Sequence, residues 1–332
     1  MSGRRPRDGR AGFLALCAVL FVTVLLAAPF FGREPIGLDD LFGDKGTTRF
    51  FIFWTLRVPR LLLGLLAGAS LSLAGLSFQA LFRNPLATPF TLGVSSGAAF
   101  GASVAVLLGV EGVLFGLDGT ALFALAFALL VVALLYGLAR RGAGLSTLHL
   151  LLAGVALSYF FAALLLTAQY FADFTETYRV VRWMMGRLDT IGYAPALTVF
   201  PAFLVGTATL FYLRRDLDLL VSGEEIARSR GVRVDRVRLH VYLAASFLTA
   251  ATVATCGPIG FVGLIVPHAL RYLLGLSHGY LIAGSVLIGG PFLVVCDVVA
   301  RNVLAETELP VGILTALLGG PFFLWLVIRR RR

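Results

Sequence analysis

Lysine is almost absent from this sequence of 332 residues, and the one that occurs excludes a common nucleotide-binding motif. Lys45 is followed by Gly46. In a P-loop the lysine follows a glycine and precedes serine or threonine, because the loop cradles the phosphates and the hydroxyl binds magnesium. The chain therefore contains no P-loop. We predict no catalytic residue here, and any ATP hydrolysis must come from another subunit.

Cysteine and histidine are also scarce. The three cysteines, Cys17, Cys256 and Cys296, lie in apolar segments without CxxC spacing or paired histidines. Such cysteines usually pack as small apolar side chains. His268, one of four histidines, has no second candidate ligand nearby in the sequence, whereas a metal site needs several. We therefore predict no metal site and no cofactor bound by this chain.

Charged residues make up only 14% of the chain, whereas 58% are hydrophobic and the mean hydropathy is +0.90. A soluble core of this size cannot hide so much apolar surface, so the composition predicts an all-α polytopic membrane protein. The net charge of +10 comes from arginines clustered between and beyond the apolar runs. Cytoplasmic loops of membrane proteins are typically basic, and nucleic-acid binding is not expected.

The apolar runs predict about ten transmembrane helices. They cover residues 11–31, 58–81, 91–110, 119–139, 145–171, 191–213, 237–256, 258–275, 279–301 and 308–328. A cleavable signal peptide is the alternative for the first run, but about 20 apolar residues are long enough to span. Arginine placement predicts that both termini are cytoplasmic, with tails at 1–10 and 329–332 and one transmembrane domain at 11–328. Residues 172–191 predict an amphipathic helix on the outer surface.

Glycines and prolines suggest an internal duplication. Gly75, Pro85, Gly93 and Gly97 are matched 182 residues later by Gly257, Pro267, Gly275 and Gly279. A chance match is the alternative, because the chain contains 37 glycines. The second and seventh spans are five crossings apart and therefore run in opposite directions. This pattern predicts an inverted repeat of helices 2–5 and 7–10, an architecture typical of transporters.

Two longer stretches carry more specific motifs. The first contains Arg57-Val-Pro-Arg60, Gln79, Arg83-Asn84-Pro85-Leu86-Ala87 and Gly93-Val-Ser-Ser-Gly97-Ala98. The second contains Gly257-Pro-Ile-Gly-Phe-Val-Gly-Leu-Ile-Val-Pro-His268, Arg271, Asp297, Arg301 and Glu308-Leu-Pro-Val-Gly312. Together, over about residues 50–328, they resemble the FecCD family, the permease subunits of ATP-driven (ABC) importers for iron siderophores, haem and cobalamin.

The resemblance implies a location and a set of partners. The chain would lie in a bacterial or archaeal cytoplasmic (inner) membrane and pair with itself or with a related permease. A periplasmic or lipid-anchored binding protein would deliver the cargo, and a cytoplasmic ATP-binding subunit, which holds ATP and magnesium, would drive alternating access. An iron(III)-siderophore is the commonest cargo in the family, with haem or cobalamin as alternatives. No set of residues separates them.

Two other classes of protein are alternatives to an importer permease. A secondary transporter driven by protons or sodium also uses inverted repeats, but it needs ionisable groups near the midplane. Apart from Asp297 near a helix end, the predicted spans contain almost none. A membrane-embedded enzyme would need converging acids, bases or metal ligands, which four scattered histidines and few carboxylates do not supply.

Three arginines, Arg57, Arg60 and Arg301, are predicted at outer helix ends, where basic residues are disfavoured. The resemblance implies that they receive acidic residues from the lobes of the binding protein. Headgroup anchoring in the lipid is one alternative. Local pairing is another, because Arg301 lies one helical turn after Asp297.

The longest inner loop, residues 214–238, predicts a short helix. Ser222 and Glu225 have the spacing of a capping box, and Gly231 is a natural end, so the helix should cover residues 223–230. The loop resembles the segment that couples FecCD permeases to their ATPase; a solvated loop is the alternative. The implied coupling residues are Ser222, Gly223, Glu224, Glu225, Ile226, Ala227, Arg228 and Gly231.

Helix-breaking and polar residues interrupt the apolar runs. Unpaired backbone groups are costly in lipid, so these positions are predicted to face protein or water around a central pathway. They are Gln79, Asn84, Pro85, Gly257, Pro258, Pro267, Gly319 and Pro321. For residues 84–89 the alternative is that a helix simply ends at the membrane surface.

Overall fold

The computed structural model describes residues 7–42, 46–110, 112–114, 117–141, 147–304 and 307–329, which are almost entirely helical. The all-α prediction is confirmed. Most of the two predicted tails, residues 1–6 and 330–332, lies outside the described residues. Their cytoplasmic placement stays a prediction.

Each predicted apolar run corresponds to a helix. Among the described residues, seven helical stretches are long and apolar enough to cross a membrane: Gly9–Phe30, Thr48–Leu81, Gly119–Leu138, His149–Phe171, Ala194–Tyr212, Val234–Cys256 and His278–Val303. Three apolar helices are shorter: Val94–Leu107, Val262–Leu274 and Val311–Trp325. The prediction of a polytopic membrane protein therefore agrees with the helix lengths, whereas the exact number of crossings stays a prediction.

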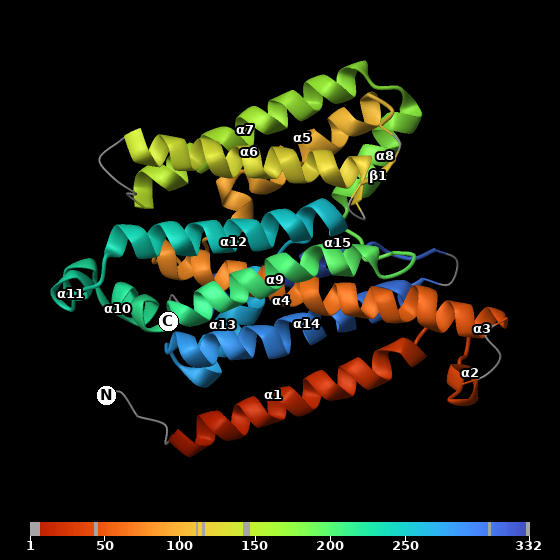
Figure 1. The fold of residues 1–332 in the computed structure, drawn as a ribbon, viewed down its shortest axis with the longest axis horizontal. Coiled ribbons are helices and arrows are strands. Elements are labelled where there is room, and N and C mark those ends of the chain that lie inside the picture. The colour runs from red at the N-terminus through yellow and green to blue at the C-terminus, as the bar shows by residue number, and fades with distance from the viewer. Residues whose placement is uncertain are drawn as a thin grey trace.

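Figure 1 labels these elements. The longer helices are α1 (Arg7–Ala27), α4 (Val58–Leu81), α5 (Val94–Leu107), α6 (Gly119–Arg141), α7 (Thr147–Phe171), α8 (Phe174–Met184), α9 (Ala194–Tyr212), α12 (Val234–Cys256), α13 (Val262–Leu274), α14 (His278–Val303) and α15 (Val311–Arg329). The shorter elements are η1 (Ala28–Phe30), α2 (Asp39–Phe42), α3 (Thr48–Phe51), the π-helical η2 (Ile52–Arg57), η3 (Pro89–Leu92), α10 (Arg214–Ser222) and α11 (Glu224–Ser229). Strands β1 (Val113–Leu114) and β2 (Leu117–Asp118) form one small hairpin.

The long helices lie side by side in layers (Figure 1). Helices α4 and α14 pack together near the centre, and α1 covers α14. Helices α9 and α12 contact α4, and α5, α6 and α7 form a further layer. Helices α10 and α11 lie at one end of the bundle, whereas α2, α3 and α8 lie at the other. The two ends therefore present separate surfaces.

Glycines allow the central helices to touch through their backbones. A methyl group on Gly68 in α4 would overlap the carbonyl oxygen of Gly289 in α14. A methyl group on Gly75 in α4 would likewise overlap Gly263 in α13. Small residues at helix contacts permit such close approach, and the van der Waals contacts that result stabilise helix association in lipid. Helix α4 is accordingly buried along most of its length.

The matched glycines and prolines do not occupy equivalent positions in the structure. Gly75 lies inside α4, whereas Gly257 follows the end of α12. Pro85 lies in a connection, whereas Pro267 lies inside α13. The order of a long, a short and a long helix is nevertheless common to α4–α6 and α12–α14. The inverted repeat stays a prediction, although the 182-residue offset from which it was drawn does not pair equivalent positions.

The predicted helix breaks fall into two groups. Helix α4 ends at Leu81, so Asn84 and Pro85 lie in the following connection, as the alternative interpretation has it. Gly257, with a φ of 69°, ends α12, and Pro258 lies in the next turn. These two breaks separate α4 from α5 and α12 from α13.

The other residues predicted as breaks lie inside continuous helices, and their role around a pathway stays a prediction. Pro267 lies within α13, and Gly319 and Pro321 lie within α15, which runs without interruption from Val311 to Arg329. An internal proline removes one backbone hydrogen bond from a helix. Within a membrane protein, neighbouring helices can satisfy the backbone carbonyl that is left without its partner. Gly319 has a packing reason, because a methyl group there would overlap the ring of Phe261.

Candidate functional site

Arg60 forms the centre of a charged cluster at the end of the bundle that carries α2, α3 and α8. Its Nε donates to Asp297 Oδ2 at 2.9 Å and its Nη2 to Asp297 Oδ1 at 2.8 Å. Its Nη1 also donates to Glu308 Oε2 at 2.7 Å. The side chain of Asp297 is 5% exposed and that of Arg60 is 15% exposed. Arg60 on α4 thus joins α14 and the segment before α15 through a bidentate, largely buried ion pair.

Arg57 lies one turn earlier and points inward. It is 7% exposed, and its Nη1 donates to the carbonyl of Pro29 at 3.0 Å. Its Nη2 donates to the carbonyl of Glu34. Arg57 therefore holds the start of α4 against the segment that follows α1. Its predicted role in docking stays a prediction, although its guanidinium is occupied by backbone carbonyls.

Arg301 is also buried, with 9% exposure. Its Nε lies 3.7 Å from Asp297 Oδ2, but this nitrogen has no hydrogen-bond partner among the described residues. The alternative of local pairing between Arg301 and Asp297 agrees with this ion pair, which is formed without a hydrogen bond from Nε. Asp297 takes its close contacts from Arg60, which is 237 residues away in the sequence.

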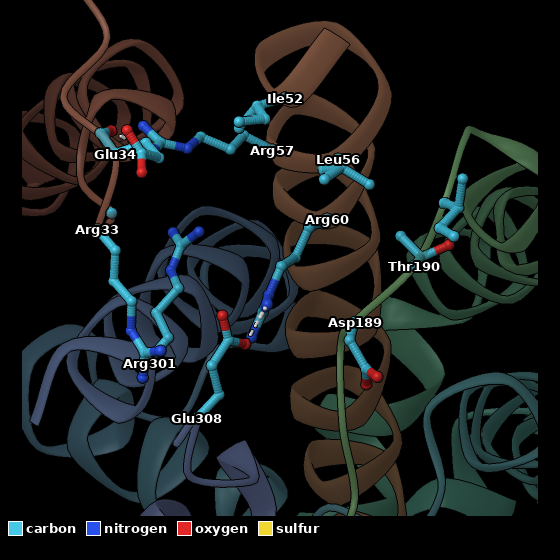
Figure 2. Close-up of a pocket in the computed structure, with 12 residues that line it drawn as sticks. Arg33, Glu34, Ile52, Leu56, Arg57, Arg60, Asp189, Thr190, Arg301 and Glu308 are labelled. Atoms are coloured by element: carbon cyan, nitrogen blue, oxygen red, sulfur yellow. Dashed lines mark hydrogen bonds and ion pairs between the residues drawn. The ribbon is translucent and has the colours of Figure 1, made fainter. Parts of the chain in front are cut away.

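The arginines surround an open cavity of about 530 Å³ (Figure 2). Arg33, Arg57, Arg60 and Arg301 line it together with Glu34, Asp189 and Glu308. A second cavity of about 520 Å³ shares Arg60, Asp189 and Glu308. Figure 2 shows the contact between Arg60 and Glu308 across the first cavity. The structure thus brings the three predicted docking arginines to one surface, although it buries two of them.

Helix α8 flanks this surface. It covers Phe174–Met184, in agreement with the predicted amphipathic helix. Its start is a true capping box, because Asp173 accepts the N–H of Glu176 at 2.7 Å and Glu176 accepts the N–H of Asp173 at 2.8 Å. Val180 and Trp183 face the protein. Arg182 of α8 lines the second cavity together with Arg60.

The predicted coupling segment forms two helices rather than one. Helix α11 covers Glu224–Ser229, close to the predicted 223–230, and α10 precedes it. The predicted capping box is wrong: Ser222 ends α10, and its hydroxyl donates to the carbonyl of Asp218 at 2.9 Å. The spacing of Leu217, Leu220 and Val221 was a sequence signal for α10, since these residues repeat at helical intervals.

Gly231 ends α11 as predicted. Its φ is 80°, and its N–H donates to the carbonyl of Arg228 at 3.0 Å. The N–H of Val232 donates to the carbonyl of Ala227 at 3.0 Å. This pair of bonds is a Schellman motif, which favours glycine because the chain needs a left-handed residue. Ala227 is fully buried beneath it.

Glu224 fixes α11 against α12. It accepts from Arg228 Nη2 at 2.9 Å and from Arg238 Nη2 at 2.7 Å. These hydrogen bonds, that from Arg228 first, lower the pKa of Glu224 from its ordinary value. Glu225 and Ile226 instead point outward, and Ile226 is 49% exposed. The segment therefore presents one exposed acid and one exposed apolar side chain at its tip.

Gln79 lies inside the bundle rather than on an open surface. It is 3% exposed; its Nε2 donates to the carbonyl of Gly263 at 2.9 Å, and its Oε1 accepts from Arg271. The residue thus joins α4 to α13. Its predicted place on a pathway stays a prediction, because any pathway between two chains lies beyond a single chain.

No cluster of three or more potential metal ligands occurs among the described residues. The cysteines Cys17, Cys256 and Cys296 are free and buried.

Comparisons with known proteins cover nearly the whole chain. The FecCD transport family matches residues 17–329. The vitamin B12 import system permease protein BtuC of Shigella boydii is 40% identical over 333 residues, which cover 99% of this chain and 98% of that protein. The hemin transport system permease protein HmuU of Yersinia pestis is 35% identical, with coverage of 100% and 98%. A solved ABC transporter assigned to the metal-chelate type, in an inward-facing conformation, superposes with a TM-score of 0.86 at 32% identity, covering 96% of this chain and 99% of that one.

Proposed function

The chain belongs to the FecCD transport family as the permease subunit of an ABC importer, and we propose that its cargo is a metal chelate, with an iron(III)-siderophore as the first candidate. The permease is not an enzyme, because ATP hydrolysis in such importers belongs to a separate ATPase subunit. The observation that carries the proposal is the superposition of almost the whole chain on a transporter of the metal-chelate type.

Cobalamin or haem is the second candidate cargo. The relatives named for vitamin B12 and for hemin align with this chain over nearly their full length. All three candidates are bulky chelates, so the cargo class is the same and only its member differs. Ion-coupled secondary transport, the remote alternative, has no support from these relatives.

The proposed mechanism uses the two ends of the bundle. Two copies of the chain, or one copy with a related permease, enclose the pathway in the inner membrane. A substrate-binding protein docks on the charged cluster around Arg60, and the ATPase receives α10 and α11. Charge complementarity at the first surface would orient the encounter. Of the three predicted docking arginines, Arg60 is the least buried, and we place the first contact there. ATP and magnesium stay on the ATPase, and the permease binds no cofactor.

The cargo is tested by the ATPase activity of the permease reconstituted with its ATPase and binding protein. Ferric siderophore, haemin and cobalamin are added in turn. We expect one of them to stimulate hydrolysis severalfold, since cargo delivery favours the conformation that hydrolyses ATP. Loss of stimulation on omitting the binding protein is the control. A complex that assembles but responds to none of the three would contradict the cargo class, and failure to assemble would contradict the importer function itself.

The inner surface is tested at Ile226. This side chain is half exposed at the tip of the segment. Burying it in a pocket of the ATPase would remove its apolar surface from water and so strengthen the contact. We expect Ile226→Asp to weaken binding to the ATPase by about tenfold. The matched variant Ile226→Leu keeps an apolar side chain and should bind normally. Equal affinities of both variants, measured by co-purification and by biolayer interferometry, would rule out a contact at this residue.

A further inference from the structure

Asp218 on α10 forms the cap of a helix to which it does not belong. Its Oδ1 accepts the backbone N–H of His278 at 2.7 Å and faces His278 Nδ1 at 2.7 Å. His278 is the first residue of α14, and the preceding Ser277 makes no side-chain capping bond. The first N–H groups of a helix lack internal partners, so a carboxylate there is favourable. Helix α10 supplies it from outside α14.

The same short helix is also bonded to the end of α4. Arg83 follows α4 and donates from Nη2 to the carbonyl of Leu220 in α10 at 2.8 Å. Arg83 adopts a φ of 47°, which is unusual for a residue with a side chain. Leu217 and Leu220 are each 1% exposed, so α10 is packed as well as bonded. Helix α10 therefore holds the adjacent ends of α4 and α14.

Helices α4 and α14 are also joined to each other in the middle and at the far end. Their backbones touch at Gly68 and Gly289 in the middle. At the far end Arg60 and Asp297 join them through the buried ion pair. Asp297 lies 19 residues beyond His278, which corresponds to about 28 Å along a helix. A displacement of α10 is thus linked by direct contacts to the charged cluster at the opposite surface.

Helix α11 is hydrogen-bonded to α12. Glu224 bonds to Arg238 of α12 at 2.7 Å. Gly223, with a φ of 151°, is the single residue between α10 and α11. The two short helices thus make their side-chain hydrogen bonds to different long helices, while Leu220, Ala227 and Val234 pack together in one buried cluster.

From these contacts we infer that Asp218 is a positioning residue, which transmits movement of the coupling segment to the α4–α14 pair through His278. The inference rests on the proposed function, since it assumes that an ATPase moves α10 and α11. Asp218 touches neither cargo nor ATP. Its role differs from that of a purely structural cap, which would affect the amount of folded protein but not the transport achieved per ATP hydrolysed.

The test measures cargo transported per ATP hydrolysed in vesicles holding the permease, its ATPase and its binding protein. We expect Asp218→Ala to lower this ratio by about tenfold, within the range of typical coupling between sites, with ATPase assembly unchanged. Asp218→Asn keeps an oxygen that accepts the His278 N–H, so it should retain most of the coupling. Asp216→Ala is the matched control, because it removes an equal charge from α10 and Asp216 has no bond to α14 among the described residues.

His278→Ala gives a second route if Asp218→Ala fails to fold. It removes the ring contact and leaves the backbone N–H bond, so the ratio should fall in the same direction. Spin labels at the outer ends of α4 and α9 provide an independent readout. ATP should change their separation in the wild type and not in the two variants. A normal ratio in the folded variants, equal to that of Asp216→Ala, would overturn the inference. If the wild type itself neither assembles nor transports, the failure belongs to the proposed function.

Discussion

Replacing Asp297 with alanine is expected to destabilise the folded permease by about 3 to 5 kcal/mol, the usual cost of removing one partner from a buried ion pair. Asp297 is 5% exposed and holds the guanidinium of Arg60 through two bonds. It is also the nearest carboxylate to the buried Arg301. The variant would leave both arginines dependent on Glu308, which is 46% exposed. The free energy of unfolding is measured by denaturing-detergent titration in mixed micelles.

Two comparisons separate this effect from a general loss of charge. Asp189→Ala removes the partner of Arg187 from an exposed pair at 3.5 Å, and it should cost no more than about 1 kcal/mol. Combining Asp297→Leu with Arg60→Leu should recover part of the loss, because apolar residues often replace a buried pair without penalty. An Asp297→Ala protein as stable as Asp189→Ala would show that the ion pair does not hold α4 to α14.

Placing valine at Gly75 is expected to prevent α4 from packing on α13. Even a methyl group at this position would overlap the backbone of Gly263, which has no side chain to move aside. Overpacking usually costs about 1 to 3 kcal/mol, and contact with a backbone places this site at about 3 kcal/mol or more. The bond from Gln79 to Gly263 would be lost as well. We expect little monodisperse protein by size-exclusion chromatography.

Gly137→Ala is the matched control for Gly75→Val. Gly137 lies inside α6, and a methyl group there would meet no atom within 4 Å. Alanine favours a helix over glycine by about 1 kcal/mol, so this variant should be as stable as the wild type or slightly more so. A Gly75→Val protein with normal yield and normal unfolding would mean that the two glycines are not in contact in the membrane.

Local patterns predicted the helices well, for a physical reason. The ten apolar runs and the polar helix α8 follow from the hydropathy of consecutive residues, which does not depend on the rest of the fold. The end of α11 at Gly231 was predictable because a helix commonly ends at a residue in the left-handed conformation, which glycine adopts most readily. The prediction of a capping box at Ser222 was wrong because the same residues are also compatible with the end of a preceding helix. Ser222 is the last residue of α10.

The long-range contacts were less predictable. Spacing along a helix predicted Arg301 as the partner of Asp297, because residues four apart lie next to each other on a helix. A partner on another helix, such as Arg60, cannot be recognised from spacing. The sequence also did not show that Gly319 makes room for the ring of Phe261 inside α15. Asp218 and His278 gave no sequence signal at all. Their contact depends on where two helices 60 residues apart come to lie.

Composition and short motifs were enough to predict a helical membrane protein, to exclude a P-loop from this sequence and to indicate one permease family. These properties follow from which residues are present and from the short spacings between them. They therefore do not depend on how the helices pack. Helix packing, in contrast, set the carboxylate that neutralises Arg60, the inward direction of Arg57 and the cap that α10 provides for α14. Such pairings are set by the angles and distances at which helices pack, because the cost of burying a charge depends on the group that meets it.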